Sequence, residues 1–168
     1  MTTITTETAK TAWPALAEIA LDVRPFYVYF HDLAELERWL RFHWRDLPTL
    51  EHAMKILRGT LPPLGWVAVA DGVPVALVFL YTTGTTLGML HYLSYNPDPS
   101  KKLAALALDA VVEAALEKAD SMGLVGVLAW TESGHVARRA RRHGFNSQTE
   151  TILYRGLPAP GTAERQTQ

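Results

Sequence analysis

Two lysines stand at the predicted start of a long helix, where positive charge is unfavourable. Pro97 and Pro99 exclude a helix before Ser100, which is itself a favourable N-cap residue. Lys101 and Lys102 therefore fall in the first turn, where the helix dipole disfavours cations by roughly 0.3–1 kcal/mol. A phosphate held by free backbone N–H groups and both lysines would explain this placement. The alternative is a pair of solvated lysines whose small penalty is screened by salt.

One histidine is placed to act as a general base. His91 lies in the run "LGMLHYLSY", whose alternation predicts a strand with Met89 and Leu93 on the same face as His91. An unperturbed imidazole titrates near neutral pH and can accept a proton from an ammonium group. Because its neighbours on that face are apolar, a hydrogen-bonded core histidine is the alternative interpretation. Glu132, just after another predicted strand, is the second candidate base, with a solvated loop carboxylate as its alternative.

The elements that must position these residues follow from the periodicity of the chain. The segment "RPFYVYF", residues 24–30, is aromatic and β-prone, and Pro25 is expected at its start or on a sheet edge. A helix follows, with Asp32 expected as its N-cap and Glu35 completing a capping box. A second amphipathic helix is expected to stop at Gly59.

Three antiparallel strands are predicted next, followed by a long helix and a parallel strand. Asp71-Gly72 predicts a tight hairpin within "GWVAVADGVPVALVFLY", and "LGMLHYLSY" supplies the third strand. The long helix runs to about Met122, with Gly123 as its left-handed cap. The apolar run "LVGVLAW", residues 124–130, is typical of a strand covered on both faces, reached by a right-handed crossover.

A shorter helix and a last strand complete the predicted fold. The helix covers about residues 134–143 and ends at Gly144, and "QTETILY" alternates as a strand should. The order βααβββαβαβ predicts an α/β (α+β) fold with a mixed, mostly antiparallel sheet flanked by helices. We expect a single domain over residues 13–157, a mobile N-terminus at 1–12 and a mobile tail at 158–168.

Composition excludes several classes of protein and site. The chain of 168 residues has no cysteine, which excludes disulfides, thiolate metal ligands and a cysteine nucleophile. Its formal charge of −1 disfavours general nucleic-acid binding. The six histidines lack metal-ligand spacing, so no metal is expected. No segment resembles a leader or a membrane span, so we expect a cytoplasmic protein with no membrane partner.

The element order over residues 61–157 resembles the core of the GNAT acyltransferases. In that family a Val-x-Pro ends the fourth strand, a loop of the type Arg/Gln-x-x-Gly-x-Gly/Ala wraps the pyrophosphate of acetyl-CoA, and Gly-Phe closes a later helix. Residues 95–97 resemble the first motif, residues 102–107 the second and residues 144–145 the third. The resemblance implies acetyl-CoA as co-substrate and an acetyl transfer to a small-molecule or peptide amine.

The resemblance also implies which residues bind the coenzyme and which act on the amine. The coenzyme would lie between the fourth and fifth strands, with its diphosphate at the following helix start. The residues so implied are Leu93, Tyr95, Ser100, Lys101, Lys102, Leu103, Ala104, Ala105 and Ser133. His91 is the first candidate to deprotonate the amine, and Glu132 is the second.

Five positions depart from the family pattern. Ala105 and Ala107 stand where glycines let the backbone approach a pyrophosphate closely. Lys102 carries positive charge but lacks the bidentate geometry of arginine. Ser133 stands at the position of the family's asparagine, and Ala140 at that of the tyrosine that protonates the CoA thiolate. The coenzyme loop is therefore degenerate, and the usual general acid is missing.

The sequence leaves two functions open. In the first, the protein is an N-acetyltransferase in which Tyr92, Tyr95 or water replaces the missing acid. In the second, it is a catalytically silent GNAT-like module that binds a partner or forms part of an assembly such as a virus particle. A homodimer is compatible with either function.

The basic cluster "RRARRH", residues 138–143, is by default a solvated helix face, since cations suit a helix C-terminus. Its alternatives are contact with the 3′-phosphate of CoA, with an acidic partner or with nucleic acid. Nucleic acid is the least favoured of these, because basic and aromatic residues are not interleaved on one predicted face.

Overall fold

A computed structural model describes residues 20–27, 31–45, 51, 54–55, 58–59, 61–82, 84–131 and 133–146. The chain divides into two units, Met1–Thr131 and Glu132–Gln168. The first unit holds a sheet and the helices that cover it, and the described residues of the second unit, 133–146, hold one short helix.

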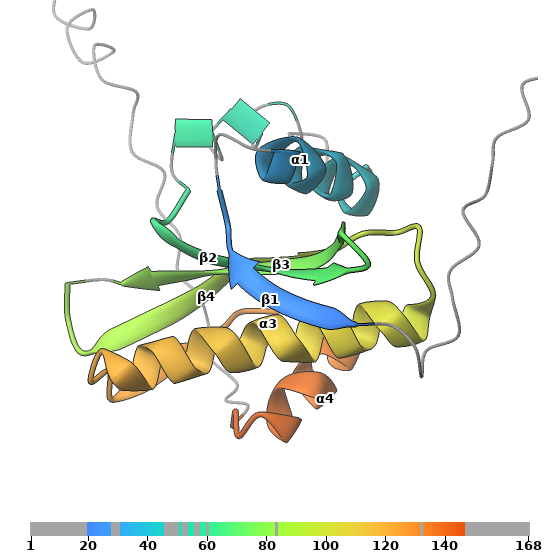
Figure 1. The fold of residues 1–168 in the computed structure, drawn as a ribbon. Coiled ribbons are helices and arrows are strands. Elements are labelled where there is room, and N and C mark those ends of the chain that lie inside the picture. The colour runs from blue at the N-terminus through green and yellow to red at the C-terminus, as the bar shows by residue number, and fades with distance from the viewer. Residues whose placement is uncertain are drawn as a thin grey trace, which may run out of the picture. The chain divides into compact units, whose positions relative to one another are not determined.

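The first unit is built on a five-stranded sheet (Figure 1). Its strands, in their order across the sheet, are β1 (Leu21–Pro25), β2 (Leu64–Ala70), β3 (Val73–Thr82), β4 (Leu87–Tyr95) and β5 (Gly126–Leu128). β1 to β4 pair antiparallel, and β5 pairs parallel with β4. The predicted fold class, a mixed and mostly antiparallel sheet in an α/β protein, is confirmed.

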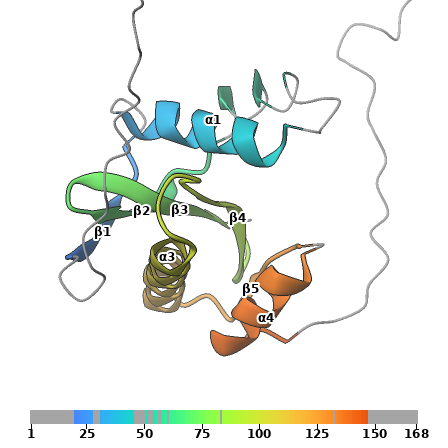
Figure 2. The same cartoon turned by 90° about the vertical axis from the view of Figure 1, so that its right-hand side faces the viewer.

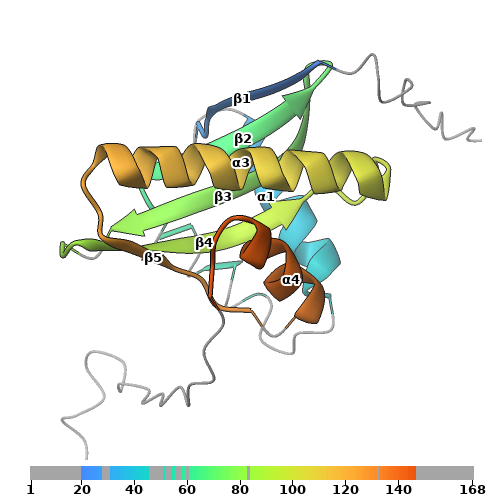
Figure 3. The ribbon, with the colours of Figure 1, turned by 90° about the horizontal axis from the view of Figure 1, so that it is seen from below.

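Two helices cover the two faces of the sheet. α1 (His31–His43) lies on one face and α3 (Lys101–Ser121) on the other (Figures 1 and 2). Seen from the α3 side, the long helix crosses the central strands (Figure 3). The described residues between α1 and β2 include five in helical conformation: Glu51, Met54, Lys55, Arg58 and Gly59. The expected stop at Gly59 is wrong, because that residue is itself helical.

Among the described residues, no helix combines the length and the apolar character needed to cross a bilayer.

Both ends of α3 follow from local chemistry. The Ser100 side chain accepts a hydrogen bond of 3.2 Å from the Leu103 backbone N–H, as an N-cap does. After Met122, Gly123 takes a left-handed φ of +72° and donates to the Asp120 carbonyl at 2.8 Å. Both predicted caps are confirmed, and they fix where the lysines of the first turn begin.

The core is formed on both faces of the central strand β3. All six residues from Val75 to Leu80 are buried, as expected of a strand covered on both sides. Leu77 and Phe79 pack in one cluster with Trp39 of α1. The intervening residues face α3, which presents small and branched buried side chains: Leu103, Ala104, Ala107, Val111, Val112, Ala115 and Ala119.

The start of the chain differs from expectation at β1. The strand spans Leu21–Pro25 rather than residues 24–30, because its register against β2 runs from Leu21 opposite Ala70 to Pro25 opposite Trp66. Pro25 does lie on an edge strand, which confirms its expected position. Proline has no backbone N–H to donate, and an edge strand needs no donor on its outer side. Residues 28–30 lie outside the described residues.

The expected capping box of α1 is wrong. The helix begins at His31, so Asp32 lies inside it. The buried Asp32 carboxylate accepts two hydrogen bonds of 2.7 Å from the Arg24 guanidinium and one of 2.9 Å from the Tyr27 N–H. The bidentate pair with Arg24 adds an opposite charge and two hydrogen bonds, which a helix cap alone does not offer the carboxylate.

The turn between β2 and β3 forms as predicted, whereas the last strand of the sheet, β5, differs from its prediction. Asp71 and Gly72 both have a positive φ, +49° and +80°, as the predicted two-residue hairpin requires. β5 is shorter than predicted, and it is not covered on both faces. Its pairing with β4 extends over only three residues, and the flanking Val125 and Trp130 are exposed.

The second unit is described over residues 133–146. α4 (Gly134–Arg142) begins after Ser133, whose side chain accepts from the Val136 N–H, and Gly144 follows its end with φ +83°. The helix and its glycine stop are as predicted. The last predicted strand, "QTETILY", and the ends expected to be mobile, residues 1–12 and 158–168, lie outside the described residues.

Candidate functional site

β4 carries a β-bulge beside the candidate base. Tyr92 and Leu93 together lie opposite the single residue Val78 of β3. Tyr92 adopts φ +52°, which is uncommon for a residue other than glycine. A bulge bends its strand and reverses the alternation of side chains beyond it. The expectation that His91 and Leu93 share one face is therefore wrong.

β4 continues well beyond its pairing with β5. The parallel pairing ends at Met89 opposite Leu128, where β5 itself ends, and β4 continues to Tyr95. Among the described residues, no strand pairs with this outer edge of β4 after Met89. Leu93 and Tyr95, two of the predicted coenzyme residues, lie on this open stretch.

The first turn of α3 is open and positively charged. The Ser100 cap uses the N–H groups of Leu103, at 3.2 Å, and Ala104, at 3.0 Å. Among the described residues, no acceptor bonds the N–H groups of Lys101 or Lys102, and the side chains of both are exposed. No acidic residue lies in this turn. Two amides and two ammonium groups are thus free to hold an anion.

The other predicted loop residues contribute through their backbone. Leu103 and Ala104 are buried against the sheet, so their side chains point away from the open end. Ala107, which replaces a glycine of the family motif, is also buried, and its methyl group fills the core rather than the open turn. Ala105 is partly exposed. The missing glycines therefore restrict this turn less than the sequence suggested.

The loop that leads into α3 is held by a buried amide. Asn96 is 3% exposed, its N–H donates to the Val75 carbonyl at 2.8 Å, and its side-chain nitrogen donates to the Pro74 carbonyl at 3.2 Å. Its side-chain oxygen accepts from the Asp98 N–H at 3.0 Å and from Arg38 of α1 at 3.1 Å. Arg38 also donates to Asp98 at 2.9 Å. The role of Arg38 and Asn96 in holding this loop was not predicted from the sequence.

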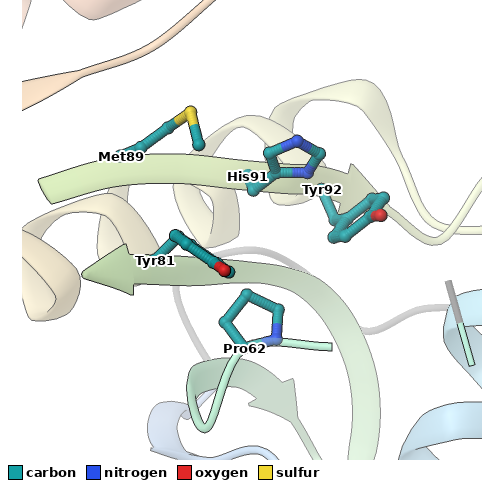
Figure 4. A pocket seen from close by; sticks show the side chains of 5 residues that line it. All are labelled: Pro62, Tyr81, Met89, His91 and Tyr92. Carbon is teal, nitrogen blue, oxygen red and sulfur yellow. The ribbon is translucent and has the colours of Figure 1, made fainter. Parts of the chain in front are cut away.

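A pocket of about 190 Å³ opens beside the bulge (Figure 4). It is lined by Pro62, Tyr81, Met89, His91 and Tyr92. Tyr81 reaches it because β3 pairs Tyr81 with Met89, and the loop before β2 brings Pro62. His91 was predicted from the sequence, whereas Pro62 and Tyr81 were not, because only the strand register and the loop before β2 bring them to His91.

His91 is exposed to this pocket. Its ring centroid lies 4.1 Å from that of Tyr92, and none of the described residues hydrogen-bonds the imidazole. The pKa of His91 is lowered, because burial of part of the ring disfavours its charged form. The ring is therefore neutral at pH 7 and able to accept a proton. His91 is therefore an exposed residue of the sheet and not part of the buried core.

The two tyrosines considered as proton donors occupy different surroundings. Tyr92 lies in the pocket beside His91. Tyr95 is 38% exposed, and its ring lies 4.4 Å from that of His43, which also contacts the Tyr95 carbonyl at 2.9 Å. Tyr92 is therefore the nearer of the two to the candidate base.

Three residues considered in the sequence analysis belong to the second unit: Glu132, Ser133 and Ala140. Glu132 lies outside the described residues. Ser133 caps α4, and Ala140 lies within that helix, both in the second unit. Over the described residues, no three His, Cys, Asp or Glu side chains meet in an arrangement that could hold a metal ion.

No protein-family model matches the sequence, and no curated protein matches it either. Solved structures do resemble the fold. A GCN5-related N-acetyltransferase from Ralstonia eutropha has a TM-score of 0.61 and 18% identity, over 80% of this chain and 98% of that one. The aminoglycoside N-acetyltransferase AAC(6')-Iy in complex with CoA has a TM-score of 0.58 and 15% identity, over 82% and 95%.

A GNAT family acetyltransferase from Brucella melitensis in complex with acetyl-CoA is similar as well. Its TM-score is 0.56 at 17% identity, over 76% of this chain and 84% of that one. The resemblance drawn from the sequence is thus confirmed for the arrangement of the elements. The chain has the fold of the GNAT N-acetyltransferases.

Proposed function

We propose that the protein transfers the acetyl group of acetyl-CoA to the nitrogen of an amine. One observation carries the proposal: β4 continues beyond its three pairs with β5 and leads to the cationic first turn of α3. In a chain with the GNAT fold, a strand edge that no described strand pairs, a proposed anion site and a candidate base would then share one continuous segment, residues 91–102.

The coenzyme would be bound by the open edge and the helix start together. The N–H groups and ammonium groups of Lys101 and Lys102 suit a diphosphate, and the Ser100 hydroxyl has its proton free to donate. The turn has no carboxylate that would repel it. The backbone of Leu93 and Tyr95 would bond the amide-containing arm as an added strand does. Leu103, Ala104 and Ala105 would contact the coenzyme only through their backbone atoms.

The reaction requires one bond exchange and two proton movements. The neutral amine nitrogen attacks the thioester carbonyl carbon, a carbon–nitrogen bond forms and the carbon–sulfur bond breaks. His91 accepts the proton lost by the nitrogen and passes it to solvent. The CoA thiolate takes a proton and leaves as the thiol. From the free amine and acetyl-CoA, the products are the N-acetyl amide and CoA.

The missing tyrosine at Ala140 does not prevent this reaction. A thiolate is a good leaving group near neutral pH, so water can protonate it after the bond breaks. Tyr92 or Tyr95 is the alternative donor, and replacing each by phenylalanine separates these routes. Positioning of the two substrates supplies most of the rate enhancement in either case.

The proposal is tested by binding and by turnover. Acetyl-CoA at 100 times its dissociation constant should raise the free energy of unfolding by about 2.7 kcal/mol, visible as a thermal shift. With an amine present, CoA thiol should appear in step with the N-acetyl product. A protein that shows neither effect at millimolar acetyl-CoA is not an acetyltransferase.

A second candidate function is favoured by a different observation. Several apolar side chains around β5 are exposed in the first unit, among them Val125 at 77% and Trp130 at 59%. Exposed apolar residues of this kind suit a partner surface, so the chain would be a silent GNAT-like binding or structural module. Pull-down of a stoichiometric partner by a protein that does not bind acetyl-CoA would favour this function. A thermal shift with turnover excludes it.

A further inference from the structure

We infer that the acceptor is a primary monoamine with a small aromatic body, an inference that rests on the proposed acetyl transfer and concerns the pocket beside His91. The lining is rich in carbon: a proline ring, two tyrosine rings, a thioether and an imidazole. These described lining residues include no aspartate, glutamate, lysine or arginine. The pocket therefore suits one apolar group and one neutral nitrogen.

The pocket lies on the sheet face that α1 covers. Phe79 and Tyr81 alternate along β3 and pair with His91 and Met89 of β4, so all four residues belong to one face. Phe79 packs in the same core cluster as Trp39 of α1. An acceptor amine that reaches His91 therefore approaches along this face, and α1, which covers it, carries the carboxylates of Asp32, Glu35 and Glu37.

Those carboxylates are already paired with arginines. The nitrogen–oxygen distance is 2.7 Å for Asp32–Arg24, 2.8 Å for Glu35–Arg38 and 2.6 Å for Glu37–Arg58. Glu51, from the segment after α1, pairs with Arg41. Each acidic residue of α1 is included. A cationic acceptor would have to displace an arginine to gain a counter-charge from these carboxylates, so the described part of this face offers little attraction to a polycation.

The same features favour an aromatic monoamine. A polyamine brings additional ammonium groups, each of which must keep its water or find a carboxylate. A monoamine brings one, and it is neutral when it attacks. Its ring can meet Tyr81 and Tyr92 edge to face and the Met89 sulfur at the ring edge. The volume of about 190 Å³ suits a body of a single ring.

The test compares two amines in the full-length protein with acetyl-CoA. 2-Phenylethylamine should give a kcat/KM at least about tenfold above that of spermidine, a factor that corresponds to roughly 1.4 kcal/mol. Met89→Glu places a carboxylate in the pocket and should reverse this order. Met122→Glu is the matched control, because Met122 is exposed at the far end of α3. It should leave the preference unchanged.

A binding measurement distinguishes a failure of this inference from a failure of the proposed function. Saturation-transfer NMR with CoA present measures contact of each amine without any turnover. Contact from 2-phenylethylamine that Met89→Glu removes and Met122→Glu keeps supports the inference, even if no amine is acetylated and the proposed function fails. Equal or stronger contact from spermidine overturns it, as does the absence of contact from 2-phenylethylamine at millimolar concentration. Preferred turnover of spermidine by the unmodified protein also overturns it while the proposed function stands.

Discussion

The guanidinium of Arg38, on α1, donates a hydrogen bond of 3.1 Å to the buried side-chain oxygen of Asn96, at the end of β4. The same guanidinium bonds Asp98 at 2.9 Å and Glu35 at 2.8 Å. Asn96 in turn is bonded to β3 through Pro74 and Val75. The loop before Ser100 is thus fixed from two sides, by β3 of the sheet and by α1.

Arg38→Met should therefore weaken coenzyme binding rather than chemistry. Without the guanidinium, the loop before α3 loses its bonds to α1, and the open first turn becomes less well positioned. We expect the KM for acetyl-CoA to rise about tenfold, roughly 1.4 kcal/mol, with kcat little changed. Steady-state kinetics with acetyl-CoA as the varied substrate measures this.

Arg58→Met is the control for Arg38, since Arg58 pairs with Glu37 at 2.6 Å but bonds no residue of the coenzyme loop. It should leave both constants unchanged. Equal effects of the two variants would mean that α1 acts on the loop through general stability and not through Arg38.

Lys101 and Lys102 should account for much of the coenzyme affinity. Charge-assisted hydrogen bonds contribute about 1.5–3 kcal/mol each, so Lys101→Ala with Lys102→Ala should weaken acetyl-CoA binding by at least about tenfold. The thermal shift at a fixed coenzyme concentration should shrink accordingly. Added salt should weaken acetyl-CoA binding by the unmodified protein more than binding by the double variant. Lys118→Ala, in the last turn of α3, should keep the full shift. An unchanged shift in the double variant would place the diphosphate elsewhere.

The pH dependence of turnover should report His91. Because burial lowers the pKa of His91 below its ordinary value of 6.5, the base stays deprotonated until the pH falls below that value. The ratio of kcat/KM between the unmodified protein and His91→Gln cancels the ionisation of the amine. This ratio should be constant above pH 6.5, at about 10²-fold or more, and should fall at lower pH.

The same shift affects stability with a definite sign. The unfolded chain binds a proton at His91 more readily than the folded protein, so the free energy of unfolding should decrease as the pH falls below 6.5. His91→Gln should remove that decrease, whereas His135→Gln, on the exposed α4, should retain it. A pH-independent activity ratio would exclude His91 as the base.

Ser94 should be replaceable without loss of stability. It is 3% exposed, and its hydroxyl has no hydrogen-bond partner among the described residues. A buried polar group without a partner costs about 1–3 kcal/mol, so Ser94→Ala should leave the free energy of unfolding unchanged or raise it. Ser100→Ala, which removes a helix cap, should lower it by about 1 kcal/mol. Chemical denaturation measures both. A clear destabilisation by Ser94→Ala would show that water or substrate satisfies its hydroxyl.

Short-range chemistry made much of the fold predictable. Ser100 and Gly123 mark the ends of α3, and Asp71 with Gly72 makes a hairpin, because each depends on the conformational preference of one or two residues. The strands of the hairpin followed from their apolar content. The same local reasoning failed at Asp32, because a favourable cap position was outweighed by an arginine in β1.

The site itself was only partly predictable. The lysines of the first turn were found because two prolines and a serine locate the helix start. His91 was found as a residue type, but its surroundings were not, since the bulge at Tyr92 has no clear sequence signal and changes which side chains share its face. Arg38 and Asn96 are 58 residues apart, so no local pattern connects them.

The sequence by itself determined the element order, the caps and the charge at the start of α3, because these depend on neighbours along the chain. Only the tertiary structure decided that β4 bulges and continues beyond its pairing with β5, that His91 faces a pocket with Tyr81 and Pro62, and that Arg38 of α1 bonds the loop before α3. These features depend on strand register and on hydrogen bonds between distant segments, which form only when both faces of the sheet are packed.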